Sequence, residues 1–203
     1  VCTACHSPQG SARYASLQAK VYDSPAHHFH AIPEPAGHTV EGTGAACVDC
    51  HMRARNYMGI DSRRDHSFRI PRPDVSMVTA APNACTSCHE QQSADWAAEK
   101  ISAHFGTQPQ PHFAPIIFAA RQGKRQANSA LLDLADNRQR PAIVRATALS
   151  LLQQYSAPNA LMRRAFTDPD PLVRLGALRG FAPDGPDDLQ LVLPLLADPM
   201  RVV

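Results

Sequence analysis

The pentapeptide Cys-x-x-Cys-His occurs three times in this chain and constrains its fold more than any other feature. The copies are Cys2–His6, Cys47–His51 and Cys85–His89, and together they use all six cysteines of the 203 residues. The pattern is the attachment signature of a c-type haem, in which each cysteine forms a thioether and the histidine becomes the proximal iron ligand. The sequence therefore predicts three covalent c-type haems. They would be attached through Cys2, Cys5, Cys47, Cys50, Cys85 and Cys88, with His6, His51 and His89 as proximal ligands.

Other cysteine chemistries fit this spacing less well. Two Cys-x-x-Cys pairs can supply four thiolates to a tetrahedral zinc ion, but one pair is then left over and the histidine after every pair is unexplained. A disulfide framework can use six cysteines, yet three identical short pairs are an odd arrangement for one. A thioredoxin-like redox motif needs a strand–helix unit beside its cysteines, and none is visible in the sequence.

The other histidines are candidates for the distal face of each iron. Ten histidines are present, so every haem can have two, and such a saturated iron carries electrons without binding substrate. We predict His27 and His30, from the dense cluster His27–His30, and His66, beside Asp65, as distal ligands. The alternatives are His112, His38, His28 and His104, with methionine ligation by Met52, Met58 or Met77 as a further possibility that would raise the potential.

Residues 1–112 are rich in Pro, Gly and Ser and poor in apolar periodicity. Such a segment cannot bury enough side-chain surface to offset its ordering entropy, so we expect the porphyrins to form its core. Helices are expected at Ala12–Tyr22 and at Ser93–Phe105, where Ser93 is a plausible N-cap, and extended loop elsewhere, including Ile70–Pro73. Arginines that would pair haem propionates are Arg53, Arg55, Arg63, Arg64, Arg69 and Arg72.

From Phe113 onward the pattern becomes helical. Helices are expected from Pro115 to Gly123 and at Ala130–Ala135, Ala142–Gln154, Ala160–Phe166, Leu172–Phe181 and Asp188–Leu196. Ile143–Leu149 aligns with Leu172–Leu178, and Asp168-Pro169 recurs as Asp198-Pro199. A repeat of this length, with an Asp-Pro turn and a Val-Arg helix, is typical of a HEAT-like α-solenoid with a leucine core, in which Asp170 caps and Pro171 lies in the first helical turn.

The predicted fold is therefore mainly α, with two domains. Residues 1–112 would form a loop-rich trihaem cytochrome domain with short helices, and residues 113–203 a HEAT-like helical-repeat domain truncated at its C-terminus. The formal charge of +2 is too small to indicate nucleic-acid binding. No run of about 18 apolar residues is present, so no membrane span is expected. Haem attachment of this kind implies export, so we expect a periplasmic or extracellular protein and a processed piece of a longer precursor.

Several runs together resemble one group of proteins. His27–His30, Cys47–Met52, Arg63–Asp74 and Pro82–His89 are similar to bacterial multihaem c-type cytochromes with C-terminal helical repeats of HEAT or tetratricopeptide type. Their broader relatives are the hydroxylamine oxidoreductase and pentahaem nitrite reductase group. The resemblance covers nearly the whole chain and implies the C-terminal portion of a longer protein. In that family the His-x-x-His cluster and the histidine of Asp-His-Ser-Phe are regular features, which favours His27, His30 and His66.

The function expected from these features is electron transfer through three bis-histidine haems. Other cytochromes or redox proteins would be its partners, and head-to-tail association of the chain into an extracellular filament would extend the haem path. The alternative is a fragment of an oxidoreductase acting on nitrogen or sulfur oxyanions, with one open haem. The resemblance implies that an open haem would lie upstream of this chain, so catalysis is not expected here. A third reading makes the helical repeats a docking surface for a redox partner.

Overall fold

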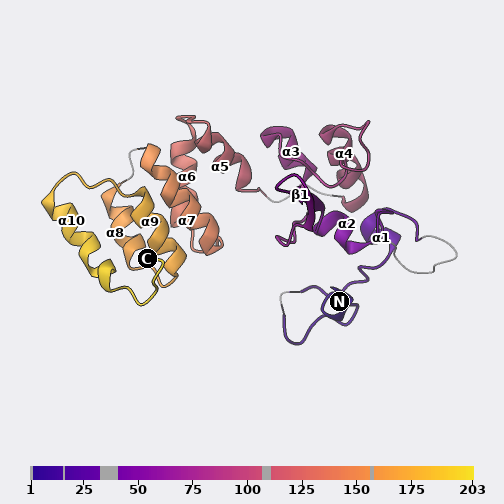
Figure 1. Cartoon of the computed structure of the whole chain (residues 1–203), viewed down its shortest axis with the longest axis horizontal. Helices are drawn as coiled ribbons and strands as arrows, with labels where there is room; N and C mark the ends of the chain where they lie inside the picture. The colour runs from indigo at the N-terminus through magenta and orange to yellow at the C-terminus, as the bar shows by residue number, and fades with distance from the viewer. Residues whose placement is uncertain (1, 16, 33–40, 107–110, 156–157) are drawn as a thin grey trace. The chain divides into compact units, whose positions relative to one another are not determined.

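The computed structural model describes residues 2–15, 17–32, 41–106, 111–155 and 158–203. The described chain is mainly helical, with a single two-stranded sheet. It divides into two compact units, Val1–Gln108 and Pro109–Val203, which are described separately below (Figure 1). The elements of the first unit are η1 (Cys2–Ala4), α1 (Pro25–His28), α2 (Cys47–His51), β1 (Ala54–Tyr57), β2 (Asp61–Arg64), α3 (Pro73–Thr79) and α4 (Ala94–Phe105).

The first unit has very little apolar interior. Among its described residues the buried hydrophobic side chains are Ala45 and Ala97, together with the ring of Pro73. Two polar side chains, His28 and Ser76, are buried as well. Because burial of apolar area is the main driving force for folding, protein side chains alone give this unit only a weak core.

Local sequence signals explain only part of the first unit. The helix expected at Ser93–Phe105 is confirmed as α4, and the Ser93 hydroxyl accepts a hydrogen bond from the Trp96 N–H at 3.1 Å. The helix expected at Ala12–Tyr22 is wrong, because the described residues there form turns and extended chain. Tyr14 and Val21 are exposed, so they give a helix here no buried apolar face to stabilise it, and Tyr22 instead packs on the rings of His6 and His27.

The hairpin β1–β2 was not expected from the sequence. Its strands are antiparallel, with Arg55 opposite Arg63 and Tyr57 opposite Asp61. The strands are joined by Met58, Gly59 and Ile60. Met58 and Gly59 have φ values of 52° and 84°, as in the mirror-image turns that suit the twist of a hairpin. Methionine is an unusual residue for the first of these positions, which is why the turn is hard to recognise in the sequence.

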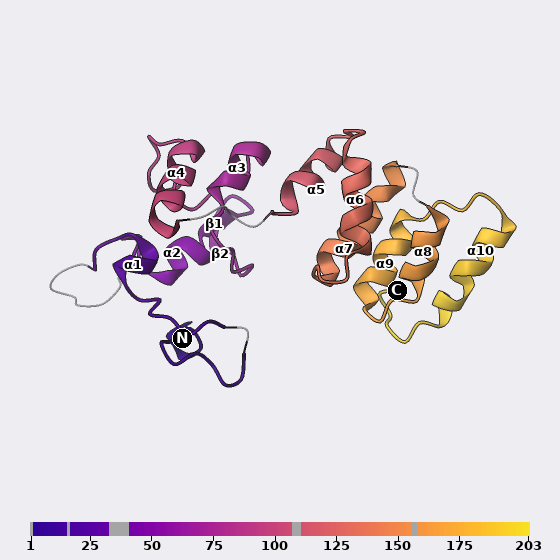
Figure 2. The ribbon, with the colours of Figure 1, turned by 180° about the vertical axis from the view of Figure 1, so that it is seen from behind.

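The helices predicted in the second unit are confirmed to within a few residues. They are α5 (Ala114–Arg121), α6 (Ala127–Asp136), α7 (Ala142–Leu151), η2 (Leu152–Gln154), α8 (Asn159–Phe166), α9 (Pro171–Gly180), α10 (Pro186–Val192) and η3 (Leu193–Ala197). Figure 2 shows the same helices from behind. The predicted cap is also confirmed, since the Asp170 carboxylate accepts from the Leu172 N–H at 2.9 Å and Pro171 opens α9.

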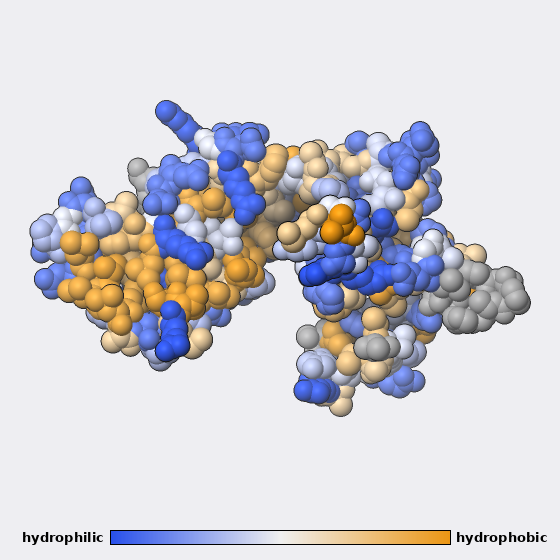
Figure 3. All heavy atoms as spheres, viewed as in Figure 1, coloured by the Kyte–Doolittle hydropathy of each residue, from blue (hydrophilic) through white to orange (hydrophobic). Residues whose placement is uncertain are grey.

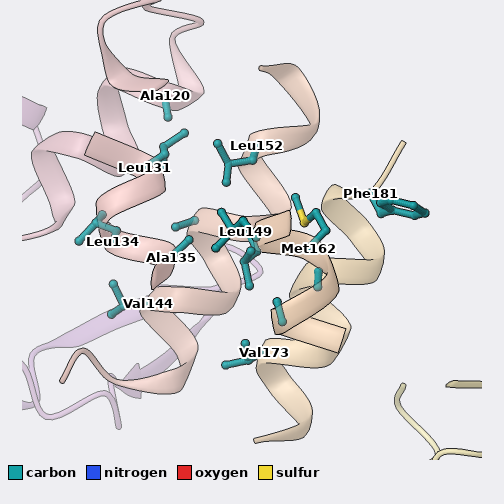
Figure 4. Close-up of a cluster of buried hydrophobic side chains, with 14 of the residues drawn as sticks. Ala120, Leu131, Leu134, Ala135, Val144, Leu149, Leu152, Met162, Val173 and Phe181 are labelled. Atoms are coloured by element: carbon teal, nitrogen blue, oxygen red, sulfur yellow. The ribbon is translucent and has the colours of Figure 1, made fainter. Parts of the chain in front are cut away.

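One hydrophobic core joins these helices (Figure 4). Leu131, Leu149, Leu152 and Val173 are fully buried in it, and each such side chain contributes about 2 kcal/mol relative to exposure. The expectation that the leucines are core is wrong toward the C-terminus. The exposed hydrophobic side chains there include Leu189, Leu193, Leu196, Met200 and Val202. Figure 3 shows hydrophobic residues gathered on one face of this unit.

Helices α7 and α9 approach each other closely through two glycines. A Cβ atom added to Gly176 would lie 2.5 Å from the Ala146 carbonyl oxygen, and one added to Gly180 would lie 1.9 Å from that of Leu149. The backbones can therefore touch only because these positions carry no side chain.

Two ion pairs join the segments that the sequence repeat aligns. The Arg145 guanidinium lies 2.5 Å from Asp168, and both side chains are almost fully buried. The Arg174 guanidinium makes two hydrogen bonds to Asp198, at 2.6 and 2.8 Å. In both cases the arginine of a Val-Arg pair binds the aspartate of the next Asp-Pro pair, so the two repeated sequence features contact each other.

Candidate haem-binding site

Each Cys-x-x-Cys-His motif forms one helical turn. In the first motif the His6 N–H donates to the Cys2 carbonyl at 2.9 Å, and in the third the His89 N–H donates to the Cys85 carbonyl at 2.9 Å. The second motif is helix α2. Residues three and four apart share one face of a helical turn. The two cysteines and the histidine of every motif therefore share one side, as attachment to a single flat porphyrin requires.

The structure brings His27 and His51 together. Their ring centres are 6.2 Å apart and their planes differ by 11°. They come from α1 and α2, which lie next to each other in both ribbon views (Figures 1 and 2). Two imidazoles that bind opposite sides of one metal ion, each at about 2 Å, have ring centres about 6 Å apart. The separation of His27 and His51 thus fits one iron between them.

A second pair, His30 and His89, has nearly the same geometry. The ring centres are 6.1 Å apart and the planes differ by 28°. Each of these two pairs combines one proximal histidine of a haem motif with one histidine of the His27–His30 cluster. Two of the three predicted distal ligands therefore lie opposite two of the three predicted proximal ligands.

Backbone carbonyls orient several of these rings. Nδ1 of His51 donates to the Arg69 carbonyl at 2.8 Å, and Nδ1 of His30 to the His28 carbonyl at 2.5 Å. Nδ1 of His66 donates in the same way to the Arg64 carbonyl at 2.8 Å. A neutral imidazole that donates through Nδ1 keeps the lone pair of Nε2 for a metal. These three rings therefore have the tautomer that iron ligation requires.

Two histidines, one half-buried and one buried, carry buried ring nitrogens without a hydrogen-bond partner. Nδ1 of His27 and both nitrogens of His28 are buried and make no hydrogen bond. Burial, followed by the nearby charges of Lys20 and His51, lowers the pKa of His27 below 6.5, and burial likewise lowers the pKa of His28. Buried unpaired polar groups are costly, so described protein contacts alone do not satisfy this cluster. The two histidine pairs, with Nδ1 of His51 and of His30 bound to carbonyls, fit haem.

Burial disfavours the thiolate form of three of the six cysteines, Cys47, Cys50 and Cys85. Burial, and after it the negative charge that the nearby Cys85 thiol would carry, raises the pKa of Cys50 to about 11. Burial also raises the pKa values of the Cys47 and Cys85 thiols. Zinc binds the deprotonated thiolate, whereas a thioether carries no charge to desolvate. Among the residues with described positions, no group of three or more His, Cys, Asp or Glu side chains is arranged to hold a metal ion directly.

The first motif has a different environment. The ring of His6 contacts Tyr22 edge-on at 5.1 Å, and Tyr22 contacts His27 edge-on at the same distance. Within the described ranges, no ring contact joins His6 to a second histidine. The third predicted distal ligand, His66, is exposed and lies near Phe68, so the structure does not bring it to a haem motif.

The reserve histidines differ from the paired ones. Nε2 of His104 donates to the Ala26 carbonyl at 2.8 Å, and the ring packs 4.2 Å from Phe29, which favours a structural role. Nδ1 of His112 accepts from the Ala114 N–H at 3.0 Å, so its proton is on Nε2, the nitrogen that would otherwise bind iron. His38 lies outside the described residues.

Most of the arginines expected at propionates bind protein carboxylates instead. Arg63 pairs with Asp61, Arg64 with Glu41, Arg69 with Asp65 and Arg72 with Asp74. Arg53 is placed differently, because its Nη1 donates to the Cys88 sulfur at 3.1 Å. The guanidinium of Arg53 therefore lies at the third haem motif.

Two residues near the site were missed by sequence reasoning. Asp49, inside the second motif, binds the backbone of the loop before it, and Gly44 in that loop lies against the ring of His30. The signal available in the sequence was an acidic residue within the motif and two glycines, Gly42 and Gly44, shortly before it.

Comparison with known proteins identifies no matching family model, no similar curated protein and no similar solved structure. No helix within the described part of the chain is both long and apolar enough to cross a membrane.

Proposed function

We propose that this chain is a trihaem c-type cytochrome that transfers electrons. The observation that carries the proposal is the pairing of proximal with distal histidines, His27 with His51 and His30 with His89, at the separation that one metal ion requires. It adds to three Cys-x-x-Cys-His motifs, each folded as a single helical turn.

The cysteines and histidines would have different roles in holding the haems. The six cysteines anchor the haems, and His6, His51 and His89 bind the irons from one side. His27 and His30 close the other side of two irons, which leaves no site there for a substrate. Bound in this way, haem supplies a one-electron couple whose potential depends on its axial ligands, hydrogen bonds and burial. The carbonyls of Arg69 and His28 fix the rings of His51 and His30.

The haems would also supply the interior that the first unit lacks. Its buried hydrophobic side chains are few within the described ranges, and a porphyrin is a large flat apolar body. We therefore assign residues 1–112 to a trihaem domain. We assign residues 113–203 to a HEAT-like repeat domain, supported by the Arg145–Asp168 and Arg174–Asp198 pairs, which recur with the sequence repeat.

The proposal extends to location and partners. Covalent haem of this type implies a periplasmic or extracellular protein, similar to the multihaem cytochromes that the motifs resemble. The partners would be other cytochromes or redox proteins. Self-association into a filament is the more specific form of this proposal, because non-closing contacts between copies produce fibres. His66, exposed and with Nε2 available, is then a candidate ligand for a haem of a neighbouring copy.

The proposal is tested by electron paramagnetic resonance of the oxidised full chain. Three low-spin ferric signals are expected, the third with a distal ligand such as His66 supplied by a neighbouring copy. The rings of His27 and His51 are nearly parallel, so the two perpendicular directions within the porphyrin plane would be unequal at the iron between them. The signal of this iron should therefore be rhombic. Signals from exclusively high-spin iron would contradict an electron carrier with closed haems.

A second candidate is an oxidoreductase acting on nitrogen or sulfur oxyanions at one open haem. The observation that favours it is the position of His6, whose ring faces Tyr22 rather than a histidine among the described contacts. The open iron would then belong to the first motif. Addition of nitrite, hydroxylamine or cyanide would shift the spectrum of one iron in three if this candidate is correct, and of none if all haems are closed.

A further inference from the structure

A short loop connects the second haem motif to the candidate distal ligand of the third haem. Asp49 lies between the two cysteines of the second motif. Its carboxylate accepts from the Gly42 N–H at 2.9 and 3.1 Å and from the Gly44 N–H at 3.0 Å. The carboxylate therefore holds both glycines over the start of α2.

Gly44 in turn lies against the ring of His30. A Cβ atom added to Gly44 would come within 2.7 Å of both Nε2 and Cδ2 of His30, and within 2.9 Å of Cε1. Real Cβ atoms essentially never come within 3.0 Å of another heavy atom. One of these three crowded ring atoms is Nε2, the nitrogen that would bind iron opposite His89.

The ring of His30 cannot easily move away. Its Nδ1 is hydrogen-bonded to the His28 carbonyl at 2.5 Å, and Gly44 is followed by Ala45, which is only 2% exposed. Gly44 also has a φ value of +80°, a conformation that glycine adopts without strain. The loop thus has one geometry that leaves room for the ring.

We propose that Asp49 and Gly44 are positioning residues for His30, so that the second haem motif sets the distal ligation of the third haem. This inference rests on the proposed function. The Asp49 carboxylate fixes the loop by accepting hydrogen bonds from two backbone N–H groups of that loop. Gly44 leaves the space in which the His30 ring faces His89. Ligands of metal sites commonly depend on such neighbours for their orientation.

The test compares two glycine variants of the haem-loaded full chain. Gly44→Ala and Gly42→Ala both place a Cβ on a backbone with positive φ, at +80° and +86°, and both keep the N–H that Asp49 binds. Nothing lies within 4 Å of the added Cβ at Gly42. We expect Gly44→Ala to convert one of three irons from low-spin to high-spin, and Gly42→Ala to keep all three low-spin. Asp49→Ala should affect the same iron as Gly44→Ala.

Three further measurements assign the effect. His30→Ala should also convert one iron, and Gly44→Ala added to His30→Ala should convert no second one, because both changes act on the same ligand. The mass of each denatured variant should show three attached haems, which separates ligand loss from failed maturation. Added imidazole should restore the low-spin signal where the third haem has lost its ligand.

Several results would overturn the inference. It fails if Gly44→Ala behaves like Gly42→Ala, if the double variant loses a second low-spin iron, or if Asp49→Ala leaves all three signals unchanged. These failures leave the proposed function intact as long as the unmodified chain shows three low-spin haems. An unmodified chain without covalent haem would contradict the proposed function, and this inference with it.

Discussion

The contact between α7 and α9 gives the second unit a position where glycine is required. The Cβ of alanine at position 180 would lie 1.9 Å from the Leu149 carbonyl oxygen and 3.3 Å from the Met162 methyl group. The methyl group of Met162 can move, but the carbonyl belongs to the backbone of α7. Reaching even the 3.0 Å limit of real contacts requires the two helices to separate by about 1 Å, a gap that forfeits a quarter to a half of each dispersion contact.

The expected cost of Gly180→Ala follows from two opposing effects. Overpacking of a well-filled interior costs about 3 kcal/mol at the upper end of its usual range. Replacing glycine by alanine in a helix contributes about 1 kcal/mol of stability. The net loss should be about 2 kcal/mol, which lowers the Tm of a unit of this size by about 10 °C.

The assay is urea and thermal unfolding of the haem-loaded full chain, followed by circular dichroism at the helix band. Gly185→Ala is the matched control, because nothing lies within 4 Å of its Cβ and its φ value of 179° suits any residue. Alanine there reduces the entropy of the unfolded chain but is less favourable than glycine at the N-cap of α10, so the stability of that variant should stay within about 0.5 kcal/mol of the unmodified chain. If Gly180→Ala is as stable as the unmodified chain, the close approach of α7 and α9 is wrong.

Two other predictions concern the ion pair and the distal ligands. Asp168→Asn should cost about 3 kcal/mol, because it leaves Arg145 buried without its charge partner. Although burial opposes it, the hydrogen bonds from Arg145 and the Asp170 N–H lower the pKa of Asp168 below 3.8. The stability from this group is therefore present above pH about 4 and lost as the pH falls through the lowered value. Urea titrations at several pH values should show a weaker acid dependence in the variant, and an unchanged dependence would contradict the assignment. His27→Ala should convert one of three irons to high-spin. His104→Ala should convert none, because Nε2 of His104 donates to the Ala26 carbonyl. Equal effects of the two variants in a paramagnetic resonance spectrum would refute the pairing of His27 with His51.

The second unit was largely predictable because its signals are local. Apolar residues at helical spacing, Asp170 as a cap and Pro171 at a helix start determine most of its helices without reference to distant residues. The exposed leucines of α10 and η3 were not predictable in the same way. Periodicity identifies a helix but does not show whether another element covers its apolar side.

The first unit was less predictable because distant residues determine it. The Met58-Gly59 turn lacks the usual hairpin residues, and the segment at 12–22 has a helical pattern but leaves Tyr14 and Val21 exposed. The candidate ligands His27, His30 and the three proximal histidines follow from composition and motif. Which distal histidine faces which proximal one depends on the tertiary fold, as do the contacts of Asp49 and Gly44.

The central claim is that three haems are covalently attached to this chain, and the mass of the denatured protein tests it most directly. The polypeptide alone has a mass of 22.0 kDa. The account predicts that mass increased by three haems, with the increase lost in steps when the cysteine pairs Cys2/Cys5, Cys47/Cys50 and Cys85/Cys88 are replaced by alanine one pair at a time. A denatured chain of 22.0 kDa, isolated from cells that mature c-type cytochromes, would contradict it.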